Sequence, residues 1–72
     1  MNWAKLLKDV RTILVLTQTE MANYLGVSFA SVNRWENGHC EPTMKVKRKL
    51  KQVCKDNNLS FESYFLIQPE RK

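Results

Sequence analysis

The stretch Gln18–Trp35 constrains the fold of this chain most, because it predicts two short helices separated by a sharp turn. Thr17 begins the first helix, and Glu20 completes the Thr-x-x-Glu capping box that satisfies free amides at a helix N-terminus. Gly26 ends this helix, since glycine enters the left-handed conformation without steric cost. Ser28 then caps a second helix over residues 29–36, which ends at a second glycine.

The spacing of residues around Gly26 indicates that the two helices cross at a steep angle. Ala22 precedes the glycine by four residues, and Val32 and Trp35 follow it by six and nine. In a helix-turn-helix, a small residue lets the helices approach, glycine makes the bend, and large apolar residues anchor the second helix. Residues 17–38 therefore predict a helix-turn-helix.

At the same residues the chain resembles a known family. Segments 16–28 (LTQTEMANYLGVS) and 31–38 (SVNRWENG), followed by Pro42, are similar to the phage-repressor and Cro-like family, also called the XRE family. The resemblance covers about residues 5–67 and implies an all-α, five-helix, lambda-repressor-like domain that binds operator DNA, usually as a dimer. Val15 departs from the family, which often has glycine after its first helix, so we expect another type of turn there.

Hydrophobic periodicity predicts helices on both sides of the motif. We expect a first helix over Trp3–Leu14 capped by Asn2, a fourth over residues 43–56, and a last one over about 61–66 capped by Ser60. The inward stripe of the first helix consists of Trp3, Leu6, Leu7, Val10, Ile13 and Leu14. That of the fourth consists of Val46, Leu50, Val53 and Cys54. In the last helix, Phe61 and Phe65 are expected to close the core, and the remaining apolar surface could form a two-fold interface.

Length and composition are those of one small domain. The 72 residues, 43% of them hydrophobic, are enough for a single core over residues 1–72, with 68–72 expected to fray. No apolar run approaches the roughly 20 residues of a membrane span, and the N-terminus lacks the apolar block of a signal peptide. We therefore expect a soluble, cytoplasmic protein without a membrane segment.

Positive charge is concentrated in one segment of the chain. The net charge is +5, and half of the 12 basic residues lie between positions 45 and 55. These six are Lys45, Lys47, Arg48, Lys49, Lys51 and Lys55. Alone, such a run is as easily a solvated helix face, but beside a helix-turn-helix it favours a nucleic-acid footprint.

The chain offers little for catalysis or for binding a metal ion. Cys40 and Cys54 lack metal-ligand spacing, and His39 is the one histidine. Both glycines are used by turns, which leaves none for a phosphate-binding loop. We therefore expect no enzyme activity, no cofactor, no metal site and no disulfide.

A DNA-reading helix is expected over residues 28–36, with its outer face in the major groove. The expected base contacts are Ser28, Phe29, Ala30, Asn33 and Arg34. Arg34 suits a bidentate bond to guanine, and an apolar side chain at 29 or 30 suits a thymine methyl group. Phe29 has a second interpretation, as a half-buried packing residue.

Phosphate contacts are expected to flank this helix. Gln18 lies at a helix N-terminus, where free amides favour an anion, and Ser31 is placed to bond bases or phosphate. The resemblance implies further phosphate contacts at Asn37, Lys45 and Lys47. It also implies an ion pair between Arg11 and Glu36 that joins the first helix to the end of the third.

Two functions share this fold. The leading hypothesis is a sequence-specific, DNA-binding transcriptional regulator, such as a repressor, that binds double-stranded DNA as a homodimer. The alternative is a protein-interaction module, such as an antitoxin or accessory subunit. Arg34 and the basic segment favour the first hypothesis, because an interaction module would not need them.

Overall fold

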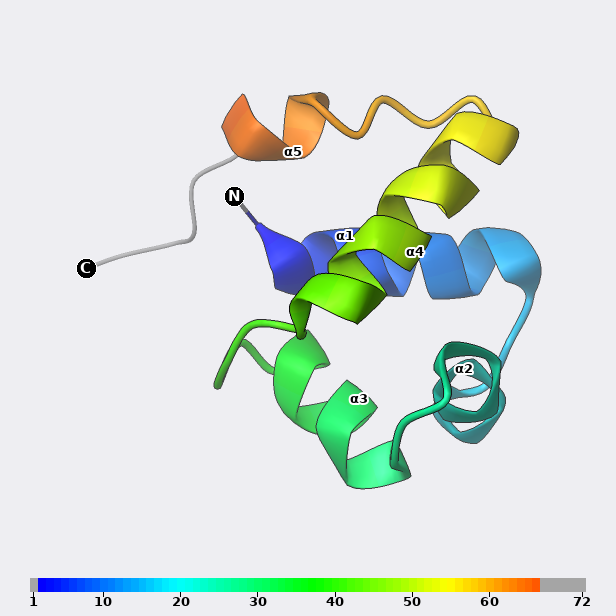
Figure 1. Cartoon of the computed structure of the whole chain (residues 1–72), viewed down its shortest axis with the longest axis vertical. Coiled ribbons are helices and arrows are strands. Elements are labelled where there is room, and N and C mark those ends of the chain that lie inside the picture. The colour runs from blue at the N-terminus through cyan, green and yellow to red at the C-terminus, as the bar shows by residue number, and fades with distance from the viewer. Residues whose placement is uncertain (1, 67–72) are drawn as a thin grey trace.

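Four helices make up most of the computed structural model, which describes residues 2–66 (Figure 1). They are α1 (Trp3–Leu14), α2 (Gln18–Leu25), α3 (Phe29–Glu36) and α4 (Met44–Asp56). A single helical turn, α5 (Ser63–Leu66), follows. Residues 2–66 contain no strand, so the all-α prediction is confirmed. Because α5 is only one turn, the count of five helices stays a prediction, and the tail predicted at 68–72 lies outside the described residues.

Helix α1 is the element that contacts most of the other helices. It contacts α3, α4 and α5, while α2 packs on α3 (Figure 1). The α1 stripe at Leu6, Leu7 and Val10 is fully buried. The other buried apolar residues are Met21, Ala22, Leu25, Val32, Trp35, Val46, Leu50, Val53, Cys54 and Tyr64. The predicted inward faces of α3 and α4 are therefore confirmed.

Ile13 was predicted to enter the core and does not. Its side chain is 42% exposed, whereas Leu14 next to it is partly buried against the core. Ile13 lies at the edge of the apolar stripe and in the last turn of α1, where a side chain has fewer neighbours to cover it. The stripe of α1 is thus narrower than its sequence indicates.

The same left-handed turn ends all four helices of eight or more residues. The residues with positive φ are Val15, Gly26, Gly38 and Asn58. In each case, the left-handed residue donates to the carbonyl three positions back, and the next residue donates to the carbonyl five positions before itself. After α1, Val15 N–H donates to the Thr12 carbonyl at 3.1 Å and Leu16 N–H to the Arg11 carbonyl at 3.0 Å. The expectation of another turn type at Val15 is therefore wrong.

Val15→Gly is expected to stabilise the protein by about 1 kcal/mol. A β-branched residue at φ 57° is strained by roughly 1–2 kcal/mol, and glycine relieves this strain. Part of the gain is cancelled, because glycine loses more conformational entropy than valine when the chain folds. Val15 is 84% exposed, so removing its side chain forfeits little packing. Urea unfolding measures the effect. Gly26→Ala is the reverse control, because a Cβ there meets no atom within 4 Å and only the φ of 73° opposes it. An unchanged or lower stability for Val15→Gly would show that the turn at 15 carries no strain.

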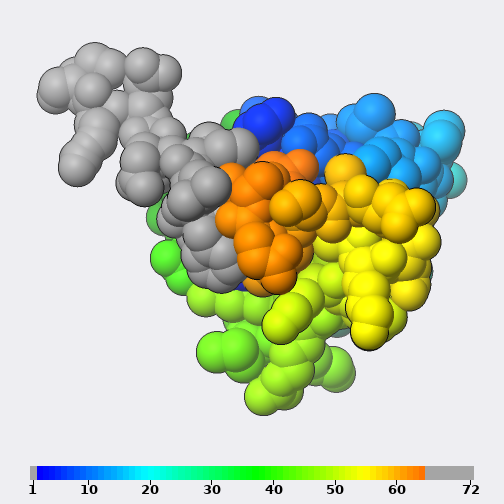
Figure 2. Space-filling model, turned by 90° about the horizontal axis from the view of Figure 1, so that it is seen from above, coloured from blue at the N-terminus to red at the C-terminus, as the bar shows by residue number. Residues whose placement is uncertain are grey.

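Tyr64 attaches the C-terminal turn to α1, although only Phe61 and Phe65 were predicted to close the core there. Its ring is buried, its hydroxyl donates to Asp9 Oδ2, and its carbonyl accepts from Asn2 N–H at 3.1 Å. Burial first, and then the bond to Asp9, raise the pKa of the Tyr64 hydroxyl, which keeps it a donor. Figure 2 shows this C-terminal region (orange) between α1 (blue) and the end of α4 (yellow).

Phe61 and Phe65 were the residues expected to close the core at this end of the molecule. Phe61 is partly buried beside Trp3, with ring centroids 6.0 Å apart. The Phe65 side chain lies outside what the structure describes. The last helix was predicted to start at Phe61, but residues 61 and 62 form a turn and α5 begins at Ser63.

Candidate nucleic-acid interface

Local hydrogen bonds define both helices of the motif. Thr17 Oγ1 accepts from Glu20 N–H at 3.1 Å, and Glu20 Oε1 accepts from Thr17 N–H at 2.9 Å, so the predicted capping box is present. Ser28 Oγ accepts from Ser31 N–H at 3.1 Å and caps α3. Because both caps and Gly26 are in place, the turn between α2 and α3 is short and hydrogen-bonded at each end.

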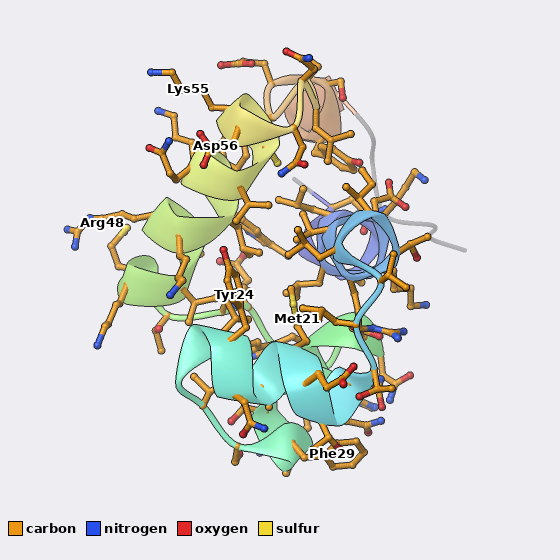
Figure 3. The ribbon with its side chains drawn as sticks, turned by 90° about the vertical axis from the view of Figure 1, so that its right-hand side faces the viewer. Met21, Tyr24, Phe29, Arg48, Lys55 and Asp56 are labelled. Carbon is orange, nitrogen blue, oxygen red and sulfur yellow. The ribbon has the colours of Figure 1, made fainter. Side chains whose placement is uncertain are left out.

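Helix α3 divides into an inner and an outer face. Val32 and Trp35 are buried in the core. Four of the five predicted base contacts are exposed, namely Ser28, Phe29, Ala30 and Arg34, while Asn33 is half-buried. Phe29, the first residue of α3, is 49% exposed and lies at the lower edge of the molecule in Figure 3. Its side chain is therefore open to a partner.

The structure brings Arg11 and Glu36 together at the junction of α1 and α3. Arg11 Nε donates to Glu36 Oε2 at 2.8 Å and Nη2 donates to Oε1 at 3.1 Å. Its Nη1 donates to the Leu16 carbonyl at 3.3 Å, so the same guanidinium also holds the segment between α1 and α2. The Glu36 side chain is only 2% exposed, against 27% for Arg11. The pair thus joins three segments of the chain around a buried carboxylate.

Three amide side chains continue from this pair to the outer face of α3. Gln18 Nε2 donates to Glu36 Oε1 at 3.0 Å, and Asn33 Nδ2 donates to Gln18 Oε1 at 3.3 Å. Asn37 Nδ2 in turn donates to Asn33 Oδ1 at 3.1 Å. We call Gln18, Asn33 and Asn37 the amide relay. All three were predicted to contact DNA, but no pattern in the sequence indicates that they bond to one another.

The basic residues of α4 do not form one continuous footprint beside α3. Lys45 is exposed near the start of α4, whereas Lys47 pairs with Glu41 at 2.8 Å and lies 5.0 Å from the centre of the Trp3 ring. The hydrogen bond and charge of Lys47 lower the pKa of Glu41. In Figure 3, Arg48 and Lys55 point away from the body on a side far from Phe29. Of the two predicted phosphate contacts on α4, Lys45 is therefore the one without an acidic partner among the described residues.

The two cysteines lie in different environments. Cys40 is exposed and Cys54 is buried, both are free thiols, and burial raises the pKa of Cys54. Within residues 2–66, no group of His, Cys, Asp or Glu side chains could hold a metal ion.

A groove of about 360 Å³ at the end of α4 is lined by Lys51, Gln52, Lys55, Leu59, Phe61 and Glu62. None of the described helices has the length and apolar character of a membrane span.

Two capped helices about a glycine turn, with an exposed outer face on the second, define a helix-turn-helix domain. A family model described as helix-turn-helix matches residues 7–55, which is more than half of the chain. The chain belongs to this family, the XRE-type helix-turn-helix proteins, whose domains bind DNA. No curated protein and no solved structure matches the chain.

Proposed function

We propose that this protein is a sequence-specific regulator of transcription that binds double-stranded DNA with α3 in the major groove. The observation that carries the proposal is the outer face of α3. It exposes an arginine and an aromatic ring, while its inner face and its end are anchored by Trp35 and the Arg11–Glu36 pair. A helix held this way presents its side chains to base edges at defined positions.

The proposed contacts divide into those that read bases and those that hold the backbone. Arg34 reads guanine through O6 and N7, and Phe29 with Ala30 contacts thymine methyl groups. Ser31, Asn37 and Lys45 bond phosphates, which sets the position of α3 without reading sequence. Lys47 is the remaining candidate on α4, and Glu41, at 2.8 Å from its ammonium group, neutralises part of its charge.

We also propose that two copies bind paired half-sites. A single α3 of eight residues reads few base pairs, and dimers gain specificity by placing two recognition helices about one DNA turn apart. The full proposal is a cytoplasmic repressor, built as a five-helix lambda-repressor-like domain, that acts as a homodimer on an inverted-repeat operator. This proposal predicts that the DNA sequence selected by the protein has two-fold symmetry.

Selection of bound duplexes from a random double-stranded DNA library tests the proposal. Enrichment of one motif, with half-sites about 10 base pairs apart, is the expected result. If no motif is enriched and retention on DNA depends on salt alone, the sequence-specific role fails. Failure to retain any DNA at low salt would instead support the protein-interaction alternative.

Lys45→Ala is expected to weaken binding to all DNA sequences alike. A phosphate contact adds affinity without specificity, so its loss lowers the slope of log affinity against log salt by about one unit. Binding curves at several salt concentrations measure this, on the selected site and on a scrambled duplex. Lys55→Ala is the matched control, since it removes the same charge about 15 Å further along α4. Equal effects of the two variants would mean that Lys45 acts only through net charge.

A further inference from the structure

The amide relay begins at the one buried carboxylate among the described residues and ends on the DNA-facing side of α3. Gln18 lies between the two, with its Nε2 on Glu36 and its Oε1 on Asn33. Glu36 is 3% exposed and accepts three side-chain hydrogen bonds, two from Arg11 and one from Gln18. The Glu36 carboxylate is therefore held in one position, and it orients the amides of Gln18 and Asn33.

The chemistry of these groups sets the direction of every bond in the relay. An ionised carboxylate only accepts hydrogen bonds, so Gln18 must turn its NH₂ end toward Glu36. Its carbonyl then faces Asn33, which must present Nδ2 and donate at 3.3 Å. The Asn33 carbonyl consequently faces Asn37, which donates at 3.1 Å. A charge inside the protein thus determines which way the Asn33 amide points.

The relay leaves Asn33 with one donor and one acceptor unused. A primary amide carries two N–H groups and two carbonyl lone pairs, and one of each is taken by Gln18 and Asn37. In the major groove, adenine offers an acceptor at N7 beside a donor at N6, which is the pair that the amide of asparagine matches. Because its amide is already held in one orientation, Asn33 loses less side-chain entropy when it binds DNA.

We infer that Gln18 is a positioning residue, which holds the Asn33 amide so that Asn33 selects an A·T base pair. This inference rests on the proposed function and assigns Gln18 a role different from the phosphate contact expected from sequence. A phosphate contact would affect all DNA sequences equally, whereas a positioning residue affects the preference at one base pair. The two roles are therefore separable by measurement.

Gln18→Met tests the inference, because methionine has a similar length and no amide to bond with Glu36 or Asn33. The probes are synthetic duplexes that carry the selected site, and the same site with each A·T pair changed in turn to G·C. We expect the wild type to prefer A·T at one position of each half-site by about tenfold or more. Gln18→Met and Asn33→Ala should each abolish that preference, and the double variant should show no further loss of preference.

Gln52→Met is the matched control, since the Gln52 amide donates to Asp56 Oδ1 at 2.9 Å on the exposed face of α4. It should leave the base preference unchanged. In the DNA-free protein, NMR should show faster hydrogen exchange of the Asn33 side-chain amide in Gln18→Met than in the wild type.

Two outcomes would overturn the inference. One is equal weakening of Gln18→Met on every duplex, which would identify Gln18 as a phosphate contact. The other is an intact A·T preference in that variant. Absence of any selected site for the wild type would refute the proposed function, and the exchange measurement would then show separately whether the relay orients Asn33.

Discussion

Arg11→Met is expected to lower the free energy of unfolding by about 3–5 kcal/mol, because it leaves a buried carboxylate without its charged partner. Glu36 is 2% exposed as a side chain and would keep only the bond from Gln18. The bond from Arg11 Nη1 to the Leu16 carbonyl would be lost as well. Stabilities of native domains are typically about 5–15 kcal/mol, so the variant should lose a large fraction of its free energy of unfolding. Urea unfolding followed by circular dichroism measures the loss.

Two further variants identify the cause of that loss. Arg11→Met combined with Glu36→Gln removes both charges and should recover much of the stability, since no buried charge is then unpaired. Lys5→Met breaks an ion pair of the same helix, Lys5–Asp9, whose side chains are 51% and 35% exposed. Exposed pairs contribute about 0–1 kcal/mol, so this control should change little. A loss for Arg11→Met as small as that of Lys5→Met would refute the structural role of the pair.

Arg34→Ala is expected to lower affinity for the selected site by about 1–3 kcal/mol and to relax the preference at one G·C pair. Arg34 is exposed on α3, and the structure shows no ion pair for it within residues 2–66. On a scrambled duplex, the loss should be smaller, because only the general attraction of a cation is removed there. Binding isotherms on both duplexes measure the difference.

Arg34→Lys is the sharper control, because it keeps the charge and removes the two-pronged geometry that guanine recognition needs. It should lose the preference for guanine while retaining most of the affinity for scrambled DNA. Arg48→Ala, on the side of α4 that Figure 3 shows far from Phe29, should leave the preference intact. If Arg34→Ala weakened both duplexes equally, α3 would not read sequence through this residue.

Local signals in the sequence were sufficient for the first three helices and their caps. The bounds of α1, the capping box at Thr17 and the glycine after α2 each depend on residues within one or two turns of the chain. These interactions form between near neighbours, so a residue pattern is enough to predict them. The fold class follows from them and from the spacing of Ala22, Val32 and Trp35.

The features that sequence did not predict depend on tertiary geometry. The Tyr64 ring is buried in the core, and its hydroxyl donates to Asp9, which is 55 positions away in the chain. Val15 adopts the left-handed conformation that ends α1, although valine disfavours it. Hydrogen bonds within the turn offset part of that strain.

The candidate site was predicted as a set of separate DNA contacts, whereas the structure shows hydrogen bonds between several of these residues. Gln18 and Asn33 are 15 positions apart and carry no pattern that marks them as a pair. Their mutual orientation comes from Glu36, whose burial is itself a result of packing. Lys47 differs from Lys45 for a similar reason, since the loop before α4 brings Glu41 within 2.8 Å of its ammonium group.

Methylation interference at guanine N7 tests most directly the claim that α3 reads the major groove. N7 lies in that groove, beside the O6 atom that an arginine fork bonds, so a methyl group there blocks such a contact. On the selected site, methylation of one guanine in each half-site should exclude the wild-type protein, and Arg34→Ala should no longer sense that guanine. Binding that is insensitive to N7 methylation throughout the site, in a wild type that still selects it, would contradict the account.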